Sequence, residues 1–134
     1  MIELELNKIK VDESRSEQLI VFREKSGTRY LPLMIGISEI QSIKMKLSGI
    51  KPPRPLTHDL FVNTLEALGA HLDKVMIEKI QNNTFFAKMS LKTREGKSLD
   101  IDARPSDCVA LAIRTGAPVF VSEEVLGQAA VTQI

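Results

Sequence analysis

The chain begins with alternating apolar and acidic side chains. From Ile2 to Leu6 every second residue is apolar and the others are glutamates, a period of two that is typical of a strand with one buried face. A polar segment at 12–16 predicts a turn, and apolar runs at 19–22 and 29–35 predict two further strands. Because Pro32 has no backbone N–H to donate, we expect the third strand to lie at a sheet edge or to be bulged. The pattern predicts a three-stranded meander.

Spacing of three and four residues indicates two helices in the middle of the chain. Residues 37–47 have apolar side chains at this spacing, with charged side chains among the others, and predict an amphipathic helix that ends at Gly49. A proline-rich segment at 52–55 then imposes extended backbone. We expect Thr57 to cap a second helix that ends at Gly69. The apolar residues that mark this helix are Leu60, Leu65 and Leu68.

Strands return in the second half. Apolar residues at 75–77 and 85–91 predict two strands. We expect Asn82 and Asn83 to join them, because asparagine tolerates the positive φ of a tight hairpin turn. Another strand is predicted at 99–103. The remaining expected elements are an apolar helix capped by Ser106 and ended by Gly116, a buried strand at 118–121, and a last helical segment opened by Ser122.

Strands interrupted by blocks of helix favour the α+β class. We predict a mixed, mostly antiparallel sheet with three to four helices packed on it. The chain has 134 residues, of which 43% are apolar and 26% charged, and these values are typical of a globular protein of one domain. The expected domain therefore spans residues 1–134.

The charge balance argues against a dedicated nucleic-acid-binding protein. Lysine and arginine number 18 against 17 aspartates and glutamates, which gives a net charge of +1, whereas such proteins usually have a strong basic excess. Aromatic residues make up 4% and there is no tryptophan, so we expect no extensive platform for base stacking. An enzyme that contacts phosphates only briefly stays compatible with this composition.

Cysteine content and hydropathy predict a cytoplasmic protein without a membrane segment. Cys108 is the single cysteine, and a lone thiol suits a reducing compartment. The N-terminus lacks the basic start and apolar core of a signal peptide. The longest apolar stretch, 31–37, is far shorter than the ~20 residues that cross a bilayer.

Two short segments share one design, an Arg-Pro pair followed by a hydroxyl residue and an acid. They are Arg-Pro-Leu-Thr-His-Asp at 54–59 and Arg-Pro-Ser-Asp at 104–107. A structural interpretation explains both as helix starts. Proline stiffens the entry, the hydroxyl caps an N–H group, and the acid faces the positive end of the helix dipole and pairs with the arginine.

A functional interpretation brings both helix starts to one cleft. Phosphodiester hydrolysis needs an activated water and cations that hold the developing negative charge. His58 suits general acid–base chemistry, and Arg54 and Arg104 can grip phosphate oxygens. Carboxylates that could bind Mg²⁺ or Mn²⁺ come from Asp59, Asp102 and Asp107. These residues match no general metal or nucleophile signature, so both interpretations stay open.

Five ordered segments resemble the bifunctional nuclease domain family. They are Tyr-Leu-Pro-Leu-Met-Ile-Gly at 30–36, the segment 54–59, Asn-Thr-Phe-Phe-Ala at 83–87, Asp-Ala-Arg-Pro-Ser-Asp at 102–107 and Gly-Ala-Pro-Val-Phe-Val at 116–121. The similarity extends from about Leu4 to Leu126. It implies an α+β domain that usually forms a homodimer, and a nuclease activity on DNA and RNA that is reported for some members.

The resemblance also implies a set of site residues. The family's motif positions fall on Arg54, Thr57, His58, Asp59, Asp102, Arg104, Ser106 and Asp107. We therefore expect His58, Asp59 and Asp107 to be catalytic, and Arg54, Arg104, Thr57 and Ser106 to bind phosphate. The expected ligands of a divalent metal, Mg²⁺ or Mn²⁺, are Asp59, Asp102 and Asp107. Cys108 stands where alanine is common, which should change packing rather than chemistry.

Three hypotheses of function follow. The first is a nuclease that hydrolyses DNA or RNA with low sequence specificity and the assistance of a metal, with nucleic acid as a transient substrate. The alternative is a non-enzymatic dimeric module that binds a phosphorylated or carboxylated ligand, or a partner protein, in the same cleft. In the third, both motifs are architectural and tie the two helix starts together across a dimer.

Overall fold

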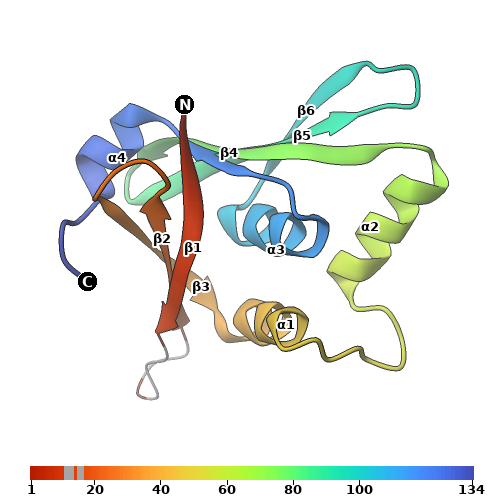
Figure 1. The fold of residues 1–134 in the computed structure, drawn as a ribbon, viewed down its shortest axis with the longest axis horizontal. Helices are drawn as coiled ribbons and strands as arrows, with labels where there is room; N and C mark the ends of the chain where they lie inside the picture. Colours follow the sequence, from red (N-terminus) through yellow and green to blue (C-terminus); the bar gives the residue numbers. More distant parts are fainter. Residues whose placement is uncertain (11–13, 15–16) are drawn as a thin grey trace.

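Seven strands and four helices make up the described part of the chain, which is residues 1–10, 14 and 17–134 of a computed structural model (Figure 1). The strands are β1 (Ile2–Lys10), β2 (Glu17–Glu24), β3 (Tyr30–Gly36), β4 (His71–Gln81), β5 (Thr84–Lys92), β6 (Ser98–Ala103) and β7 (Val119–Val121). The helices are α1 (Ile37–Leu47), α2 (Thr57–Ala67), α3 (Pro105–Thr115) and α4 (Glu123–Ala129). None of the helices in these ranges is both long and apolar enough to cross a membrane.

One mixed sheet joins all seven strands in the order β3-β2-β1-β7-β4-β5-β6. The first three strands form an antiparallel meander, as predicted, and β4, β5 and β6 form a second one. Between the two meanders lies β7, antiparallel to β1 and parallel to β4, with Val119 opposite both Leu4 and Val75. Pro32 lies in β3 at one edge of the sheet, where its missing N–H is tolerated. The predicted α+β class with a mostly antiparallel sheet is confirmed.

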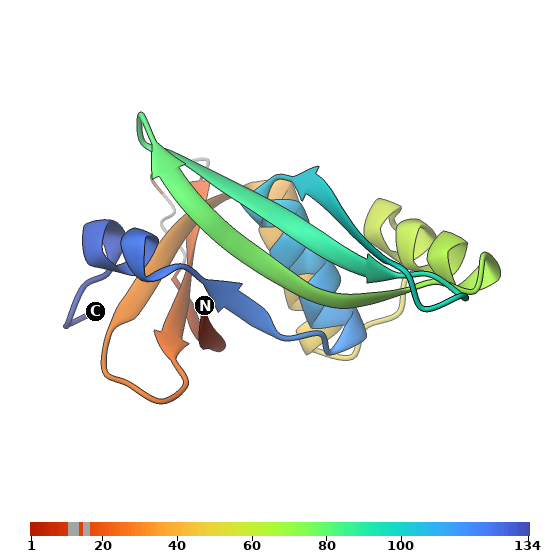
Figure 2. The same ribbon diagram turned by 90° about the horizontal axis from the view of Figure 1, so that it is seen from above.

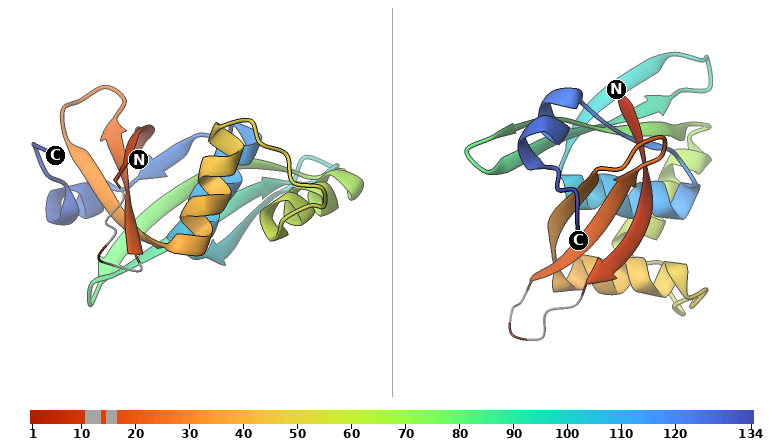
Figure 3. Two further views of the ribbon diagram at one scale, coloured as in Figure 1. Left: turned by 90° about the horizontal axis from the view of Figure 1, so that it is seen from below. Right: turned by 60° about the vertical axis from the view of Figure 1, so that its left-hand side comes forward.

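The sheet curls around α3. Figures 2 and 3 show α3 inside the curl, with α1 beside it and β1 to β3 forming a wall at an angle to β4 and β5. Five consecutive residues of α3, from Cys108 to Ala112, are buried, because strands and helices surround the helix on several sides. Apolar side chains of both meanders complete the core around it, among them Ile20, Phe22, Leu31, Leu33, Val75 and Ile77. Their removal from water is the main favourable contribution to folding.

Local turn chemistry agrees with the sequence at the β4–β5 hairpin. Asn82 and Asn83 have φ of 53° and 60°, the left-handed conformation that a two-residue hairpin turn requires at both positions. Helix α1 is followed by Gly49 at φ 73°, as its spacing predicts. The polar segment expected to turn at 12–16 lies outside the described residues, apart from Ser14 in a turn.

Of the three leucines that marked α2 in the sequence, only Leu65 packs against the core. Leu60 and Leu68 are 57% and 69% exposed, and the side chains that pack against the core are Phe61, Val62 and Leu65. The helix has apolar residues on more than one face, and helical spacing alone does not say which face meets the protein. In α2, no residue is fully buried.

The expected N-caps are also wrong by one or two positions. Leu56 and Arg104 hold the extended N-cap conformation, while Thr57 and Ser106 lie inside the first helical turns. At α3 the cause is Pro105, whose fixed φ starts the helix at the residue before Ser106. At α2 the Asp59 carboxylate, rather than Thr57, accepts the hydrogen bond of the Leu56 backbone N–H at 3.1 Å.

Candidate active site

The starts of α2 and α3 meet at a histidine–aspartate contact. Nε2 of His58, in the first turn of α2, lies 3.0 Å from Oδ1 of Asp107, in the first turn of α3. The two residues are 49 positions apart, and they meet because α2 and α3 pack against each other. Both side chains are largely buried and their polar atoms line a cavity. The contact therefore joins the two segments that share one design.

Arg104 holds the same carboxylate from the other side. Its Nε donates to Oδ2 of Asp107 at 3.0 Å and its Nη2 donates to Oδ1 at 3.2 Å. Nη2 also lies 4.0 Å from Oε1 of Glu39 on α1. The Arg104 side chain is 68% exposed, so solvent reaches the guanidinium.

Electrostatics keep Asp107 ionised. Burial pushes the pKa of its carboxyl upwards, but the hydrogen bonds from Arg104 and His58 outweigh burial and hold the pKa below its usual value. The same contact raises the pKa of Arg104. At neutral pH the site thus contains a fixed negative charge beside a permanent cation.

A cavity of about 420 Å³ opens beside these groups, and we call it the His58 cavity. Its walls come from α1, the start of α2 and the start of α3. The lining residues are Ser38, Glu39, Gln41, Ser42, Met45, Leu56, Thr57, His58, Arg104 and Asp107. Three hydroxyl groups, one imidazole, one guanidinium and two carboxylates face a volume in the range of small-ligand pockets.

Asp59 lies elsewhere. Its Oδ1 accepts a hydrogen bond from Nε of Arg114 at 2.8 Å, and its Oδ2 accepts the Leu56 N–H. Burial raises the pKa of Asp59, and the bonds from Arg114 and Leu56 lower it by more, so the pKa ends below its usual value. Asp59 lines a neighbouring cavity of about 400 Å³ and not the His58 cavity. The structure therefore separates it from His58 and Asp107.

Arg114 fixes the packing behind the site. Its side chain is only 5% exposed, and its Nη2 donates to Oγ of Ser42 on α1 at 2.6 Å. Through Asp59 it also holds the start of α2. One guanidinium near the end of α3 thus connects the three helices that frame the His58 cavity.

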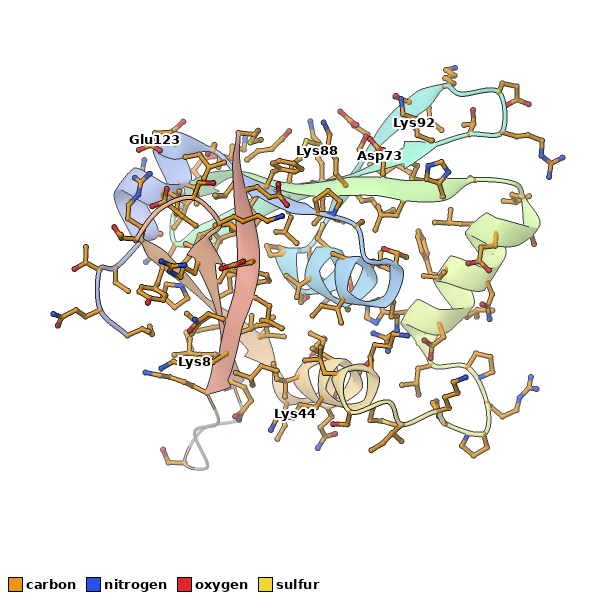
Figure 4. The ribbon with its side chains drawn as sticks, viewed as in Figure 1. Lys8, Lys44, Asp73, Lys88, Lys92 and Glu123 are labelled. Carbon is orange, nitrogen blue, oxygen red and sulfur yellow. The ribbon has the colours of Figure 1, made fainter. Side chains whose placement is uncertain are left out.

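Asp102 projects from the face of the sheet that points away from α3. It pairs in register with Lys88 of β5, and directly paired residues share a face. Figure 4 shows Lys88 on the side of the sheet away from α3. The three aspartates expected to bind one metal are therefore not brought together, and the described ranges contain no group of three histidine, cysteine or acidic residues that could hold a metal ion. The side chains as placed do not fit a divalent-metal site.

The remaining predicted site residues have different positions. Thr57 lines the His58 cavity. Arg54 is exposed in the loop before α2 and is not among the lining residues of this cavity, and Asp59 pairs with Arg114 instead of Arg54. The predicted arginine–aspartate pair forms only in the second segment, between Arg104 and Asp107. Ser106 lines a larger groove on the other side of Arg104.

Sequence reasoning missed Glu39, Ser42 and Arg114. Glu39 lies in the first turn of α1, and its carboxylate lies so near Gly36 that a Cβ on Gly36 would meet it at 2.5 Å. The sequence pattern predicts only that Glu39 is one polar position of an amphipathic helix, and it does not indicate that Glu39 lines a cavity. Arg114 and Asp59 are 55 residues apart, so their pairing leaves no local signal.

Cys108 has no part in this chemistry. It is 1% exposed in α3, and burial raises its pKa to about 12. A thiol that stays protonated and shielded from solvent is not a nucleophile at neutral pH. The expectation that Cys108 affects packing rather than chemistry agrees with this position.

Comparison with known proteins connects these segments with a described family. The sequence model of the bifunctional nuclease domain matches residues 20–133. A protein of Mycobacterium tuberculosis (strain H37Rv), named only as uncharacterized, is 42% identical over 121 residues, which cover 90% of this chain and 71% of that protein. Bifunctional nuclease 1 of Oryza sativa subsp. japonica is 24% identical over 121 residues, 87% of this chain and 36% of the rice protein.

Proposed function

Because the chain belongs to the bifunctional nuclease domain family, we propose that it hydrolyses phosphodiester bonds of DNA or RNA, with low sequence specificity, in the His58 cavity. The rice relative is named a bifunctional nuclease, which supports this class of reaction. The observation that carries the proposal is the 3.0 Å contact between His58 and Asp107 at the wall of the cavity. It supplies a proton-transfer group with a fixed orientation.

His58 is the proposed general base. The carboxylate of Asp107 contacts Nε2 of His58. A carboxylate partner stabilises the histidine tautomer that carries its proton on that nitrogen. Nδ1 is then the unprotonated nitrogen that can accept a proton from an attacking water. Removal of this proton makes the water a better nucleophile towards phosphorus, and the protonated imidazole is stabilised by the negative charge of Asp107.

Arg104 is the proposed phosphate-binding group. Two of its nitrogens contact Asp107, and its exposed guanidinium retains N–H groups that can donate to phosphate oxygens. The charge on these oxygens rises during attack by water, so a fixed cation stabilises the transition state more than the substrate. Thr57 lines the same cavity, and its hydroxyl can donate to the same oxygens.

Dependence on a divalent metal stays a separate prediction. The resemblance points to Mg²⁺ or Mn²⁺, but Asp59 is held by Arg114 and Asp102 lies on the other face of the sheet. No step of the mechanism above passes through a metal. Cleavage assays with Mg²⁺, with Mn²⁺ and with a chelator test this prediction directly.

We also propose a homodimer and a cytoplasmic location. Family resemblance implies the homodimer, and α2 supports it, because Leu60 and Leu68 are exposed on a helix that has no fully buried residue. The cytoplasmic location rests on the single cysteine, Cys108, which is buried and free. A thiol of this kind suits a reducing compartment.

The two histidines of the chain provide a matched test of the activity. We expect purified wild-type protein to cleave DNA or RNA, and His58→Ala to lower the rate by about 10²–10⁴-fold because the general base is lost. His71→Ala is the control, since His71 is exposed at the start of β4 and outside the lining of the His58 cavity. Single- and double-stranded DNA and RNA serve as substrates, and the melting temperature of each variant is recorded.

Each other outcome contradicts a defined part of the proposal. Equal cleavage by wild type and His58→Ala means that the activity comes from a contaminant or from another site. Absence of cleavage by wild type in every metal condition favours the binding module, in which Arg104→Ala should abolish binding of an anionic ligand. A large loss of stability in His58→Ala, with no cleavage by wild type, favours the architectural interpretation.

A further inference from the structure

A second, larger groove adjoins the His58 cavity. Its volume is about 990 Å³, and we call it the edge groove because β3 and β6 are the two edge strands of the curled sheet. Residues of β3, of the β4–β5 hairpin end, of the β6–α3 connection and of the C-terminal segment contribute to its walls. Backbone hydrogen bonds of 2.8 Å between Tyr30 and Val131 hold the C-terminal segment beside β3.

Apolar side chains in this groove are open to solvent. Phe86 is 37% exposed, Met34 is 55% exposed, and both line the groove. Pro32 and Pro105 add rigid apolar surface. Exposed apolar surface that lines a concave site is typical of a binding site, and flat or rigid groups of this kind suit a planar ligand.

Polar groups lie among the apolar walls. Asn83, Asp102 and Gln133 line the groove, and their amide and carboxylate groups can pair with the ring nitrogens, carbonyls and amino groups at the edge of a heterocycle. Positive charge surrounds the site as well. Lys10 and Arg104 line it, and Nζ of Lys79 lies 4.8 Å from the ring centroid of Phe86.

Arg104 connects the edge groove with the proposed reaction site. It lines both the edge groove and the His58 cavity. The same guanidinium therefore borders the acid–base groups of the His58 cavity and the aromatic and amide groups of the edge groove. A nucleotide combines the two matching parts, an anionic phosphate and a planar base with polar edges. Charge and shape thus point to the same ligand class on both sides of Arg104.

We propose that the edge groove binds unpaired nucleobases of a single-stranded nucleic acid whose phosphate lies at Arg104. This inference rests on the proposed function, and it adds a preference for single strands. In a duplex the bases are stacked and paired, so their faces and edges are not free to enter a groove. In a single strand every base has a free π-face that an aromatic side chain can contact.

The lack of tryptophan in the chain gives a direct test of base binding. Phe86→Trp introduces a single fluorophore into the groove, and Phe120→Trp is the matched control. Phe120 lies in β7 outside the groove, with a similar lysine contact, Nζ of Lys74 at 5.9 Å. The probes are a single-stranded oligothymidylate, an abasic oligomer of the same length, and a duplex, all with phosphorothioate linkages that resist hydrolysis.

We expect the single strand to quench Phe86→Trp and to leave Phe120→Trp unchanged. The abasic oligomer and the duplex should quench neither variant at the same concentration. Phe86→Ala should weaken binding of the single strand by about 5- to 150-fold, the effect of losing one stacked base. If Phe86→Trp does not melt like wild type, Met34→Trp reports on the opposite wall of the groove.

Two results would overturn the inference. One is equal binding of the abasic oligomer and the oligothymidylate, because the bases then contribute nothing. The other is quenching of neither groove variant by the single strand. Both are distinguishable from failure of the proposed function, because the fluorescence measurement detects binding whether or not His58 supports cleavage.

Discussion

Two arginine–aspartate pairs flank the candidate site, and solvent exposure separates their roles. The Arg104–Asp107 pair is open, with the Arg104 side chain 68% exposed, whereas the Arg114 side chain is 5% exposed. A cation in contact with water can exchange its solvent partners for a phosphate. A buried cation cannot do so without losing the bonds that compensate its desolvation. This difference supports the phosphate-binding role proposed for Arg104 and a framework role for Arg114.

The framework role of Arg114 predicts unequal stability losses for its two side-chain partners. Asp59→Ala should lower the free energy of unfolding by about 2–3 kcal/mol, because a charged group in a buried position loses its counterion. Ser42→Ala removes a neutral partner and should cost about 1 kcal/mol. Urea unfolding measures both. Replacing Arg114 with methionine in the Asp59→Ala background should recover part of the loss, and a further loss would contradict this explanation.

Acid should destabilise the protein through Asp59 and Asp107. The pKa values of Asp59 and Asp107 lie below the ordinary value of 3.8 in the folded chain. At pH values around and below 3.8 these aspartates bind protons in the unfolded chain but not in the folded chain. The stabilisation from the two ionised carboxylates is therefore complete at neutral pH and decreases as the pH falls through this range. Unfolding free energies at pH 7 and pH 3 should differ less for Asp59→Asn than for wild type. Equal differences would contradict the role of Asp59.

At the scale of elements, sequence patterns predicted what is decided locally. The bounds of α1, the Asn82–Asn83 turn and the edge position of Pro32 follow from backbone preferences of a few neighbouring residues. The exposed face of α2 does not follow from such local preferences. Leu60 and Leu65 are equally apolar, and the packing of α2 against the rest of the protein decides which of them is buried. The N-caps failed for a similar reason: Pro105 and Asp59 determine the helix starts more strongly than the neighbouring hydroxyl groups.

Two glycines should respond in opposite directions to the same substitution. Gly116 ends α3 at φ 76°, and Gly127 lies within α4; an added Cβ meets nothing within 4 Å at either position. Gly116→Ala should lower the free energy of unfolding by about 1 kcal/mol because its backbone is left-handed. Gly127→Ala should raise it by about 0.5–1 kcal/mol through better helix propensity. Thermal melting compares them, and equal shifts would contradict this explanation.

At the scale of the whole molecule, one interpretation of the sequence brought the two helix starts to one cleft, but the sequence did not predict which side chains pair there. His58 and Asp107 meet across 49 residues, and Asp59 and Arg114 across 55. Both pairings join α2 to α3 and depend on the packing of these two helices. Nothing in a local pattern indicates that a short strand near the end of the chain lies at the centre of the sheet. Asp102 was grouped with the other aspartates because all three are carboxylates at the family's motif positions, and that resemblance does not say whether they share a face of the sheet.

The proposed self-association through α2 concerns the whole molecule and has its own test. We expect wild type to sediment as a dimer, and the double substitution of Leu60 and Leu68 to lysine to shift the equilibrium to monomer, because charged side chains in an apolar interface are costly to desolvate. Leu47→Lys on α1 is the control, since Leu47 is also exposed. A wild-type monomer at all concentrations, or an unchanged dimer in the double variant, would contradict the role of α2.

The central position of β7 also has a consequence for biosynthesis. Within the described residues, the β1–β3 and β4–β6 meanders do not pair directly with each other and share a sheet through residues 119–121. A ribosome releases these residues after both meanders, so the nascent chain carries two separate half-sheets with unpaired inner edges until β7 emerges. Such edges are sites of aggregation. We therefore expect the interval before β7 emerges to be the stage at which the nascent chain is most prone to aggregate.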